Sequence, residues 1–218
     1  MRHDLAYAFR ALRKTPAFTA VVAVSIALGI AANTTVFSMV NATLLGALPV
    51  RDAGGLYAVS GGKTFPYPDY RDFRDQCASV FSGLAGHFPL APASLAGAGT
   101  PERIWGQLVT GNYFSVVGPP VTLGRGIHPE EDRIPGQNPV VVVGDSLWRR
   151  RFGADPRALG KTVLLNGRAY TVVGVMAPGF RGTDRGIVSE FWAPLSMRAD
   201  FIPDMIKDTE SAASRSPW

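Results

Sequence analysis

The longest apolar run in the chain lies near its amino-terminal end. No ionisable side chain occurs between Lys14 and Arg51, and the apolar centre of this interval runs from Pro16 to Val40. About 20 apolar residues are enough to cross roughly 30 Å of hydrocarbon. A helix satisfies its own backbone N–H and C=O groups, which lipid cannot do. The pattern therefore predicts a transmembrane helix and its outer extension over residues 15–49.

The charges on either side of this run indicate its orientation. Residues 1–14 hold four basic side chains and one acidic one, whereas Arg51 stands beside Asp52 on the other flank. Because Lys and Arg are retained on the cytoplasmic side, we expect residues 1–14 to form a cytoplasmic basic segment and the rest of the chain to lie outside. A cleaved signal peptide shows the same order of basic, apolar and small residues, here Ala31 and Ala32, and is the alternative.

Small residues recur at every fourth position within the run. Ala23, Ala27 and Ala31 share one helix face, and Ser25 and Gly29 share a neighbouring one. This spacing lets two helix backbones approach closely in lipid, so it is compatible with partner helices. Alanine in a single, unpartnered anchor gives the same pattern, and both interpretations stay open.

Composition limits the possible roles of the chain beyond the apolar run. The chain has 218 residues and a formal charge of +5, and much of the excess positive charge belongs to residues 1–14, where attraction to the inner leaflet explains it without nucleic acid. We expect one exterior core domain over residues 50–200 and a polar tail or truncated linker over residues 201–218. Cys77 is the only cysteine, which excludes an intramolecular disulfide and a cysteine zinc site.

Within this domain, strand and helix periodicities alternate and predict a mixed α+β fold. Asn166 and Gly167 stand between two apolar runs and predict a hairpin with a type I′ turn. We expect Asn112 and Asp145 to cap helices and Gly153 to end one. Residues 88–100 suit either a strand with a hairpin or a mobile loop. Strands are predicted at 56–60, 103–110, 140–143, 162–165, 169–175 and 190–194, and helices at 68–86, 111–118 and 145–152.

Two segments imitate binding sites without meeting their spacing. The acidic residues Glu130, Glu131 and Asp132 are adjacent, so their side chains diverge, and a solvated loop is favoured over a metal site. Residues 160–162 read Gly-Lys-Thr, like the end of a phosphate-binding loop, but Asp155 stands where the first glycine belongs and a strand comes next instead of a helix. We expect neither a metal nor a nucleotide site.

The residue types of catalysis are also scattered. His3, His87 and His128 show no catalytic or ligand spacing, and no G-x-S-x-G motif occurs. Cys77 lies on an apolar helical stripe and is interpreted as a packed hydrophobic residue. Residues 149–151 are consecutive arginines that splay around a helix as a solvated or interface face. We therefore predict no catalytic residue, no cofactor and no enzyme activity, and a membrane-tethered hydrolase is disfavoured.

Several segments together resemble a known family. In order they are DLAYAFRALRKTPAF, PYPDYRDFRD, PERIWGQLVTGNYFSVVG, VVVVGDSLWRRRFGADPRALGKTVLLNGRAYTVVGVMAPGFRG and FWAPL. Over residues 4–197 the chain resembles the amino-terminal part of MacB/FtsX-type ABC transporter permeases, most closely the large duplicated permeases of the acidobacterial type. The resemblance implies a first transmembrane helix, a mixed α and β periplasmic core domain and a separate cytoplasmic ABC ATPase. The later helices and second repeat of the family are missing, so we expect a fragment or a natural short product.

These patterns lead to two functional hypotheses. In the first, the resemblance implies a non-catalytic, single-pass module of the bacterial inner membrane that couples the ATPase to export or envelope processes. Its partners are then the ATPase, other permease helices or a second permease copy, and the membrane, with no nucleic acid. The second hypothesis is a secreted or membrane-anchored periplasmic binding or interaction domain. The mass of the mature chain separates them, since cleavage near Ala32 would release the domain.

Overall fold

The computed structural model divides the chain into two compact units, Met1–Gly46 and Ala47–Trp218, which are described separately. The structure describes residues 14–41, 49–50, 52–59, 67–97, 100–184 and 186–202. Most of the basic segment predicted at residues 1–14 and most of the tail predicted at residues 201–218 therefore lie outside the described residues. The boundaries drawn from the sequence stay predictions.

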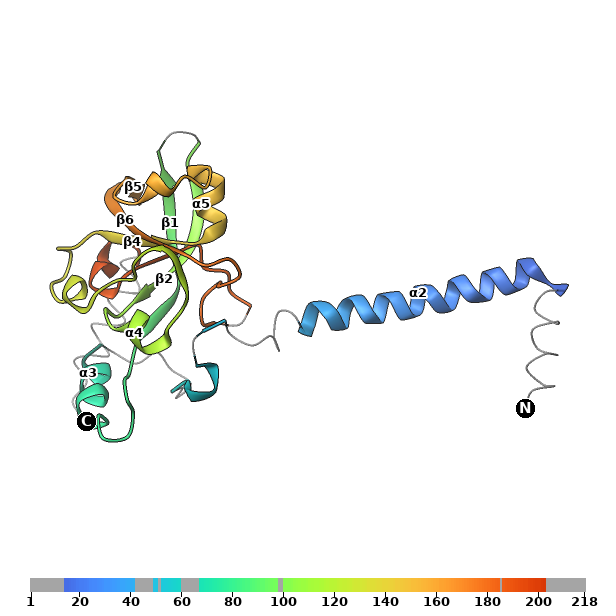
Figure 1. Ribbon diagram of the computed structural model, residues 1–218, viewed down its shortest axis with the longest axis horizontal. Helices are drawn as coiled ribbons and strands as arrows, with labels where there is room; N and C mark the ends of the chain where they lie inside the picture. The colour runs from blue at the N-terminus through green and yellow to red at the C-terminus, as the bar shows by residue number, and fades with distance from the viewer. Residues whose placement is uncertain are drawn as a thin grey trace. The chain divides into compact units, whose positions relative to one another are not determined.

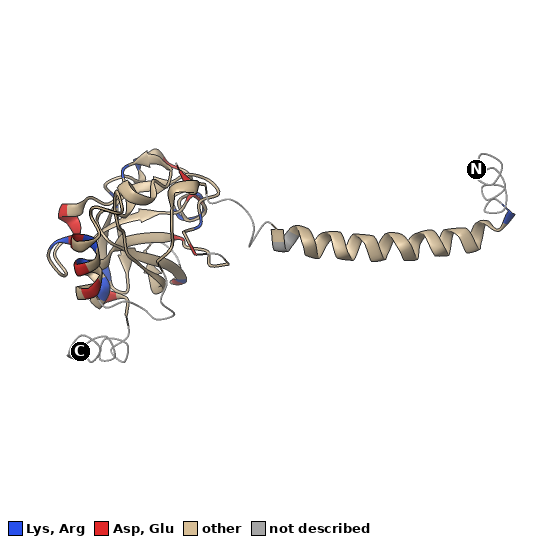
Figure 2. Ribbon diagram, turned by 90° about the horizontal axis from the view of Figure 1, so that it is seen from below, with Lys and Arg blue, Asp and Glu red and all other residues tan. Residues whose placement is uncertain are grey.

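The first unit contains α2, one unbroken α-helix over Pro16–Val40 (Figure 1). Its residues Pro16–Ser38 are long and apolar enough to cross a membrane, and none of that window is buried within the structure. Figure 2 shows the helix without Lys, Arg, Asp or Glu along this length. The predicted helix is confirmed, and its composition is that of a transmembrane segment.

Hydroxyl groups of α2 bond within the helix. Ser25 Oγ donates to the carbonyl of Val21 over 2.9 Å, and Thr35 Oγ1 donates to that of Ala31 over 2.7 Å. In lipid, an unpaired hydroxyl would be costly, so these bonds make the two polar side chains compatible with a membrane span.

The second unit is built on one sheet that closes on itself. The strand order is β3-β6-β4-β7-β2-β1-β5, and β5 also pairs with β6, so six strands form a ring. β3 pairs with the end of β6 beyond the stretch that β5 occupies. Ring closure leaves few free strand edges. The strands are β1 (His87–Ala96), β2 (Glu102–Val109), β3 (Val121–Gly124), β4 (Val140–Val143), β5 (Thr162–Leu165), β6 (Arg168–Met176) and β7 (Phe191–Pro194).

Short helices precede and connect the strands. They are α3 (Tyr67–Gln76), α4 (Tyr113–Val117) and α5 (Asp145–Phe152), with the 3-10 turns η2 (Ala53–Gly55), η3 (Pro129–Asp132), η4 (Pro156–Ala158) and η5 (Leu195–Asp200). The mixed fold predicted from the sequence is confirmed. Of the two alternatives for residues 88–100, the strand is the one observed, since β1 covers this segment as far as Ala96.

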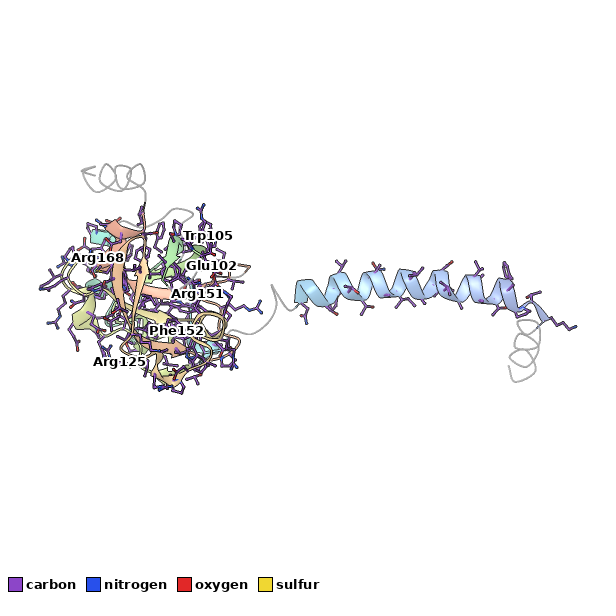
Figure 3. All side chains as sticks on the ribbon, turned by 90° about the horizontal axis from the view of Figure 1, so that it is seen from above. Glu102, Trp105, Arg125, Arg151, Phe152 and Arg168 are labelled. Atoms are coloured by element: carbon purple, nitrogen blue, oxygen red, sulfur yellow. The ribbon has the colours of Figure 1, made fainter. Side chains whose placement is uncertain are left out.

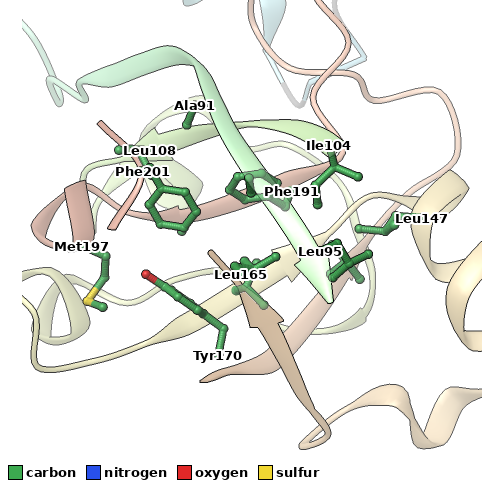
Figure 4. Close-up of a cluster of buried hydrophobic side chains, with 14 of the residues drawn as sticks. Ala91, Leu95, Ile104, Leu108, Leu147, Leu165, Tyr170, Phe191, Met197 and Phe201 are labelled. Atoms are coloured by element: carbon green, nitrogen blue, oxygen red, sulfur yellow. The ribbon is translucent and has the colours of Figure 1, made fainter. Parts of the chain in front are cut away.

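The ring encloses the main core, part of which Figure 4 shows. Phe191 is fully buried and stacks on Phe201 with ring centroids 5.4 Å apart, and Tyr170 lies 5.6 Å from the same Phe201 ring. Phe201 and its neighbour Ile202 are buried in this core, although the sequence pattern predicted both to belong to the tail. The folded domain therefore reaches at least Ile202.

A second cluster lies on the opposite face of the same strands. Alternate residues of a strand point to opposite faces, so Val141 and Val143 enter the main core while Val142 enters the second cluster. This explains why the sequence of β4 is apolar at every position. The second cluster consists of Val109, Tyr113, Ile127, Val142, Met176, Phe180 and Trp192, with Val50, Ala85, Phe114, Val117, Val121, Val140 and Val173 packed against it.

The β5–β6 hairpin is confirmed at its turn. Asn166 and Gly167 both have positive φ, 51° and 82°, as a type I′ turn requires. Asn166 also ties the turn to other parts of the domain: its Oδ1 accepts a 2.7 Å hydrogen bond from the Ser94 amide, and its Nδ2 donates to the Asp200 carbonyl over 2.8 Å.

Replacing Asn166 by Ala should lower the free energy of unfolding by roughly 2–4 kcal/mol, because alanine tolerates positive φ poorly and both hydrogen bonds are lost. Asn166→Gly keeps the backbone conformation and should recover part of the loss. Asn138→Ala, which removes an amide without a side-chain hydrogen bond among the described residues, is the control. Urea denaturation measures all three, and equal stability of Asn166→Ala and Asn138→Ala would contradict this account of the turn.

Three predictions about local structure are wrong. The helix predicted over residues 68–86 ends at Gln76, because the chain then turns and brings the Leu84 carbonyl to the hydroxyl of Tyr70 and the side-chain amide of Asn112. Asn112 does precede α4, but this contact occupies its side chain, which does not cap the helix. The residue preceding α5 is Gly144, and Asp145 pairs with Arg149 one turn later.

The strand predicted at residues 56–60 is also wrong over its described part. Leu56–Val59 has no regular secondary structure and pairs with no strand among the described residues, and Tyr57 is 79% exposed. A segment without a ladder partner leaves its backbone groups unpaired by a sheet, so an apolar pattern alone does not make it a strand.

Candidate functional site

The chain enters the second unit beside an open hollow, which we name the attachment hollow. Its volume is about 610 Å³. Val50 packs against the second cluster, so apolar contacts hold the first described residues of this unit. The lining residues are Pro49, Val50, Phe114, Gly118, Pro119, Pro120, Val121 and Gly126.

The shape of the attachment hollow depends on α4 and on one glycine. Gly118 ends α4 with a φ of 64°, and the two prolines after it prevent the helix from continuing. Phe114 lies against Gly126, where an added Cβ would overlap the aromatic ring. Phe114 also meets Tyr113 edge to face, with ring centroids 5.6 Å apart. The position of Phe114 is therefore fixed from two sides.

A partly buried network of polar side chains includes two members of the second cluster, Tyr113 and Trp192, and we name it the polar latch: His87, Gln107, Tyr113, Asp184 and Trp192. Gln107 is fully buried on β2. Its Nε2 donates to Asp184 Oδ2 over 2.6 Å, and its Oε1 accepts from Trp192 Nε1 over 2.9 Å. The Tyr113 hydroxyl lies 3.5 Å from the same Oε1. The latch thus joins β2, α4 and β7 to the segment after β6.

Charge in the polar latch is concentrated at its solvent side. His87 Nε2 lies 2.8 Å from Asp184 Oδ2, and both side chains are partly exposed. The hydrogen bond from His87 holds the pKa of Asp184 below its usual value. Burial raises the pKa of Tyr113 to about 12, so its hydroxyl stays protonated as a hydrogen-bond donor. The arrangement holds these segments together. The buried hydroxyl of nearby Ser189 has no hydrogen-bond partner among the described residues.

The lowered pKa of Asp184 makes a pH-dependent prediction. A carboxylate whose folded pKa is depressed contributes stability above its unfolded pKa of about 3.9 and loses it as the pH falls through the folded value. Asp184→Asn should therefore lower the unfolding free energy by roughly 1–3 kcal/mol at pH 7. At pH 3 the difference from the wild type should shrink. Urea denaturation at both pH values tests this, with exposed Asp72→Asn as control; a difference that is the same at both pH values would contradict it.

The acidic segment is only in part the solvated loop that the sequence predicted. Asp132 is only 8% exposed and accepts hydrogen bonds from the amides of Gly111 and Ser196 over 3.0 and 2.7 Å. Burial raises its pKa. Glu131 forms two hydrogen bonds with Arg125, of 2.7 and 2.8 Å. Carboxylate oxygens that are withdrawn from solvent need hydrogen-bond donors from the protein, so these two side chains connect neighbouring loops. Glu130 is exposed, and the interpretation as a solvated residue holds for it.

The three arginines of α5 splay apart as expected, but one has a structural role. Arg150 pairs with Glu102 and Glu190 over 2.8 and 2.7 Å, which ties α5 to β2 and to the start of β7. Arg151, which Figure 3 labels together with Glu102, is partly buried, whereas Arg149 is exposed. Because 42% of the Arg150 side chain is exposed while it forms these pairs, the interpretation as a solvated or interface face stays a prediction.

The remaining candidates lie apart from these features. Cys77 is a free, partly buried thiol that borders a smaller hollow beside Arg74 and Phe81. Residues 160–162 lead into β5, as expected for a segment that is not a phosphate-binding loop. Among the described residues no group of three or more His, Cys, Asp or Glu side chains is arranged to hold a metal ion.

Comparison with known proteins identifies the family. The MacB-like periplasmic core domain matches residues 19–213, so the chain belongs to this family. The resemblance to ABC transporter permeases inferred from the sequence is thereby confirmed. A search of curated proteins finds no match.

Three solved domains are among those similar to this chain. The extracellular domain of the noncanonical ABC-type transporter YknZ from Gram-positive bacteria is 17% identical, with a TM-score of 0.46 and 67% of each chain covered. The periplasmic region of MacB from Actinobacillus actinomycetemcomitans is 23% identical, with a TM-score of 0.42, 62% of this chain covered and 57% of that one. A domain of a putative permease from Porphyromonas gingivalis is 19% identical, with a TM-score of 0.37 and coverage of 52% and 50%.

Proposed function

We propose that this chain is the membrane-anchored periplasmic module of a MacB/FtsX-like permease and that it couples a separate cytoplasmic ABC ATPase to export or to envelope processes. The observation that carries the proposal is the union, in one chain, of the apolar helix α2 and a MacB-like periplasmic core domain. The basic residues before α2 favour a cytoplasmic amino terminus, which puts the domain on the periplasmic side of the inner membrane.

The architecture suits a mechanical role. A ring of six strands with a continuous core resists shear, because each strand is held by neighbours on both sides and packed interiors deform little. The ring therefore moves as a body when force enters the domain, and the attachment hollow, which lies outside the ring, is where the chain enters. No catalytic group is needed for this task, so we propose that the module is not itself an enzyme.

Exchange of the helix tests the coupling. The full chain is purified with its co-purifying ABC ATPase in lipid nanodiscs, and ATP hydrolysis is compared with that of a variant in which an unrelated single-pass helix replaces Pro16–Ser38. The exchanged helix keeps the domain anchored. The module should then no longer affect the rate of ATP hydrolysis by the ATPase, so this rate should differ from that of the full chain. Unchanged hydrolysis, or the absence of any co-purifying ATPase, would refute the proposal.

Intact mass separates this proposal from a secreted domain. The mature chain in the membrane fraction should keep the full sequence mass. A mass that corresponds to cleavage near Ala32 would instead establish a released domain without a helix to transmit movement.

A further inference from the structure

We propose that the second cluster is a conformational joint, in which the seating of Phe114 in the attachment hollow and the closure of the polar latch depend on each other. The two features share α4. Phe114 lines the hollow, and Tyr113, its neighbour in the chain, belongs to the latch. Their rings meet edge to face at 5.6 Å, so one side chain cannot turn without disturbing the other.

Two of the contacts that hold the segment of residues 177–184 lie at Phe180 and at Asp184. Phe180 packs on Trp192 with ring centroids 5.5 Å apart, and Asp184 accepts hydrogen bonds from His87 and Gln107. Between these points Gly182, with a φ of 108°, comes so close to Gln107 that an added Cβ would lie 3.0 Å from its Nε2. Both points therefore converge on one pair of side chains, Trp192 and Gln107, which are bonded to each other.

The hydrogen bonds of the Tyr113 hydroxyl tolerate little displacement of the side chain. Its hydroxyl is buried and lies 3.5 Å from both Gln107 Oε1 and Thr183 Oγ1, at the outer limit of a hydrogen bond. A further displacement of α4 would leave this hydroxyl unpaired in an apolar site, which is unfavourable. Opening the segment at Asp184 and Thr183 would remove one of these two partners, Thr183 Oγ1, from the other side. Packed interiors answer such conflicts by switching between arrangements and not by continuous deformation.

The joint links two different surfaces of the second unit. Val50, next to the start of the unit, packs on the second cluster from the attachment hollow. At the other end, His87 and Asp184 reach solvent with 30% and 27% of their side chains exposed. A displacement of the entering chain is thereby converted into a change at the 177–184 segment. This property belongs to the domain and holds whether or not an ATPase drives it.

Hydrogen exchange of single N–H groups in the full chain, in lipid nanodiscs, tests the joint by NMR. Gly126→Ala unseats Phe114 by overlap with its ring, and Phe114→Leu is a milder second variant. Each should speed exchange about tenfold at the Trp192 indole N–H, which donates to Gln107, and at the Ser189 amide, which donates to the Arg181 carbonyl. The Trp148 indole N–H, bonded to the Asp155 carbonyl, should keep its rate and serves as the internal control.

Coupling must also act in reverse. Asp184→Asn should speed exchange of the Val116 amide in α4 by a similar factor, again with the Trp148 indole unchanged. Gly54→Ala is the matched glycine control, because the nearest atom to its added Cβ lies 3.7 Å away. The proposal is overturned if Gly126→Ala and Phe114→Leu leave the exchange rates at Trp192 and Ser189 at wild-type values. It is also overturned if Asp184→Asn leaves the exchange rate of the Val116 amide unchanged, or if exchange at the Trp148 indole rises equally in these variants.

Discussion

Replacement of Phe191 by Ala is expected to lower the free energy of unfolding of the domain by about 3–5 kcal/mol. Phe191 is fully buried in the main core and stacks on Phe201. Its strand, β7, pairs with β2 in parallel and with β4 in antiparallel orientation, so it joins two parts of the ring. Removing the aromatic side chain leaves a cavity where three strands and the carboxyl-terminal residues of the core meet.

Urea denaturation followed by tryptophan fluorescence measures this change. Val188→Ala, three residues earlier and 49% exposed, is the matched truncation and should change the unfolding free energy by less than about 1 kcal/mol. If both variants lost the same stability, β7 would not occupy the centre of the closed sheet.

Leu28→Arg should remove the chain from the membrane fraction. Leu28 lies near the middle of Pro16–Ser38, far from either end of the helix. An arginine at the centre of a transmembrane helix raises its insertion free energy by about 2.5–3.5 kcal/mol, and a side chain at mid-span reaches the interface only with difficulty. The expected result is loss of most of the chain from carbonate-washed membranes.

The control for this variant is Thr15→Arg. The same side chain at the start of the helix can extend to the headgroup region, so membrane retention should persist. If Leu28→Arg remained in the membrane to the same extent, α2 would not cross the hydrocarbon core.

Much of the fold could be predicted from local signals. The apolar run predicted α2, four consecutive valines predicted β4, and Asn166 with Gly167 predicted the hairpin, because each signal acts within a few residues. The ring closure could not be predicted in this way. It depends on β5 meeting β1 in addition to its hairpin partner β6, and on β2 lying parallel to β7. The pairings of β5 with β1 and of β2 with β7 join distant segments, and they leave no mark in periodicity.

The hydrogen-bond networks around Gln107 and Asp132 could not be predicted from the sequence for a related reason. Gln107 stands in an apolar strand pattern, and a polar residue at a buried position signals a hydrogen-bond network, but its partners Asp184 and Trp192 are more than 70 residues away. Asp132 resembled its exposed neighbour Glu130 in sequence, and only the approach of Gly111 and Ser196 buries it. Where partners come from distant segments, residue type alone does not reveal a role.

The topology of α2 and the domain is the central claim, and thiol labelling tests it most directly. In a Cys77→Ser background, Ser146→Cys puts one thiol at an exposed position of α5, and Arg10→Cys puts one in the basic segment. A membrane-impermeant maleimide added to spheroplasts should label the thiol at position 146 and leave that at position 10 unlabelled until the membrane is permeabilised. Labelling of position 10 from outside, with position 146 protected, would contradict the account.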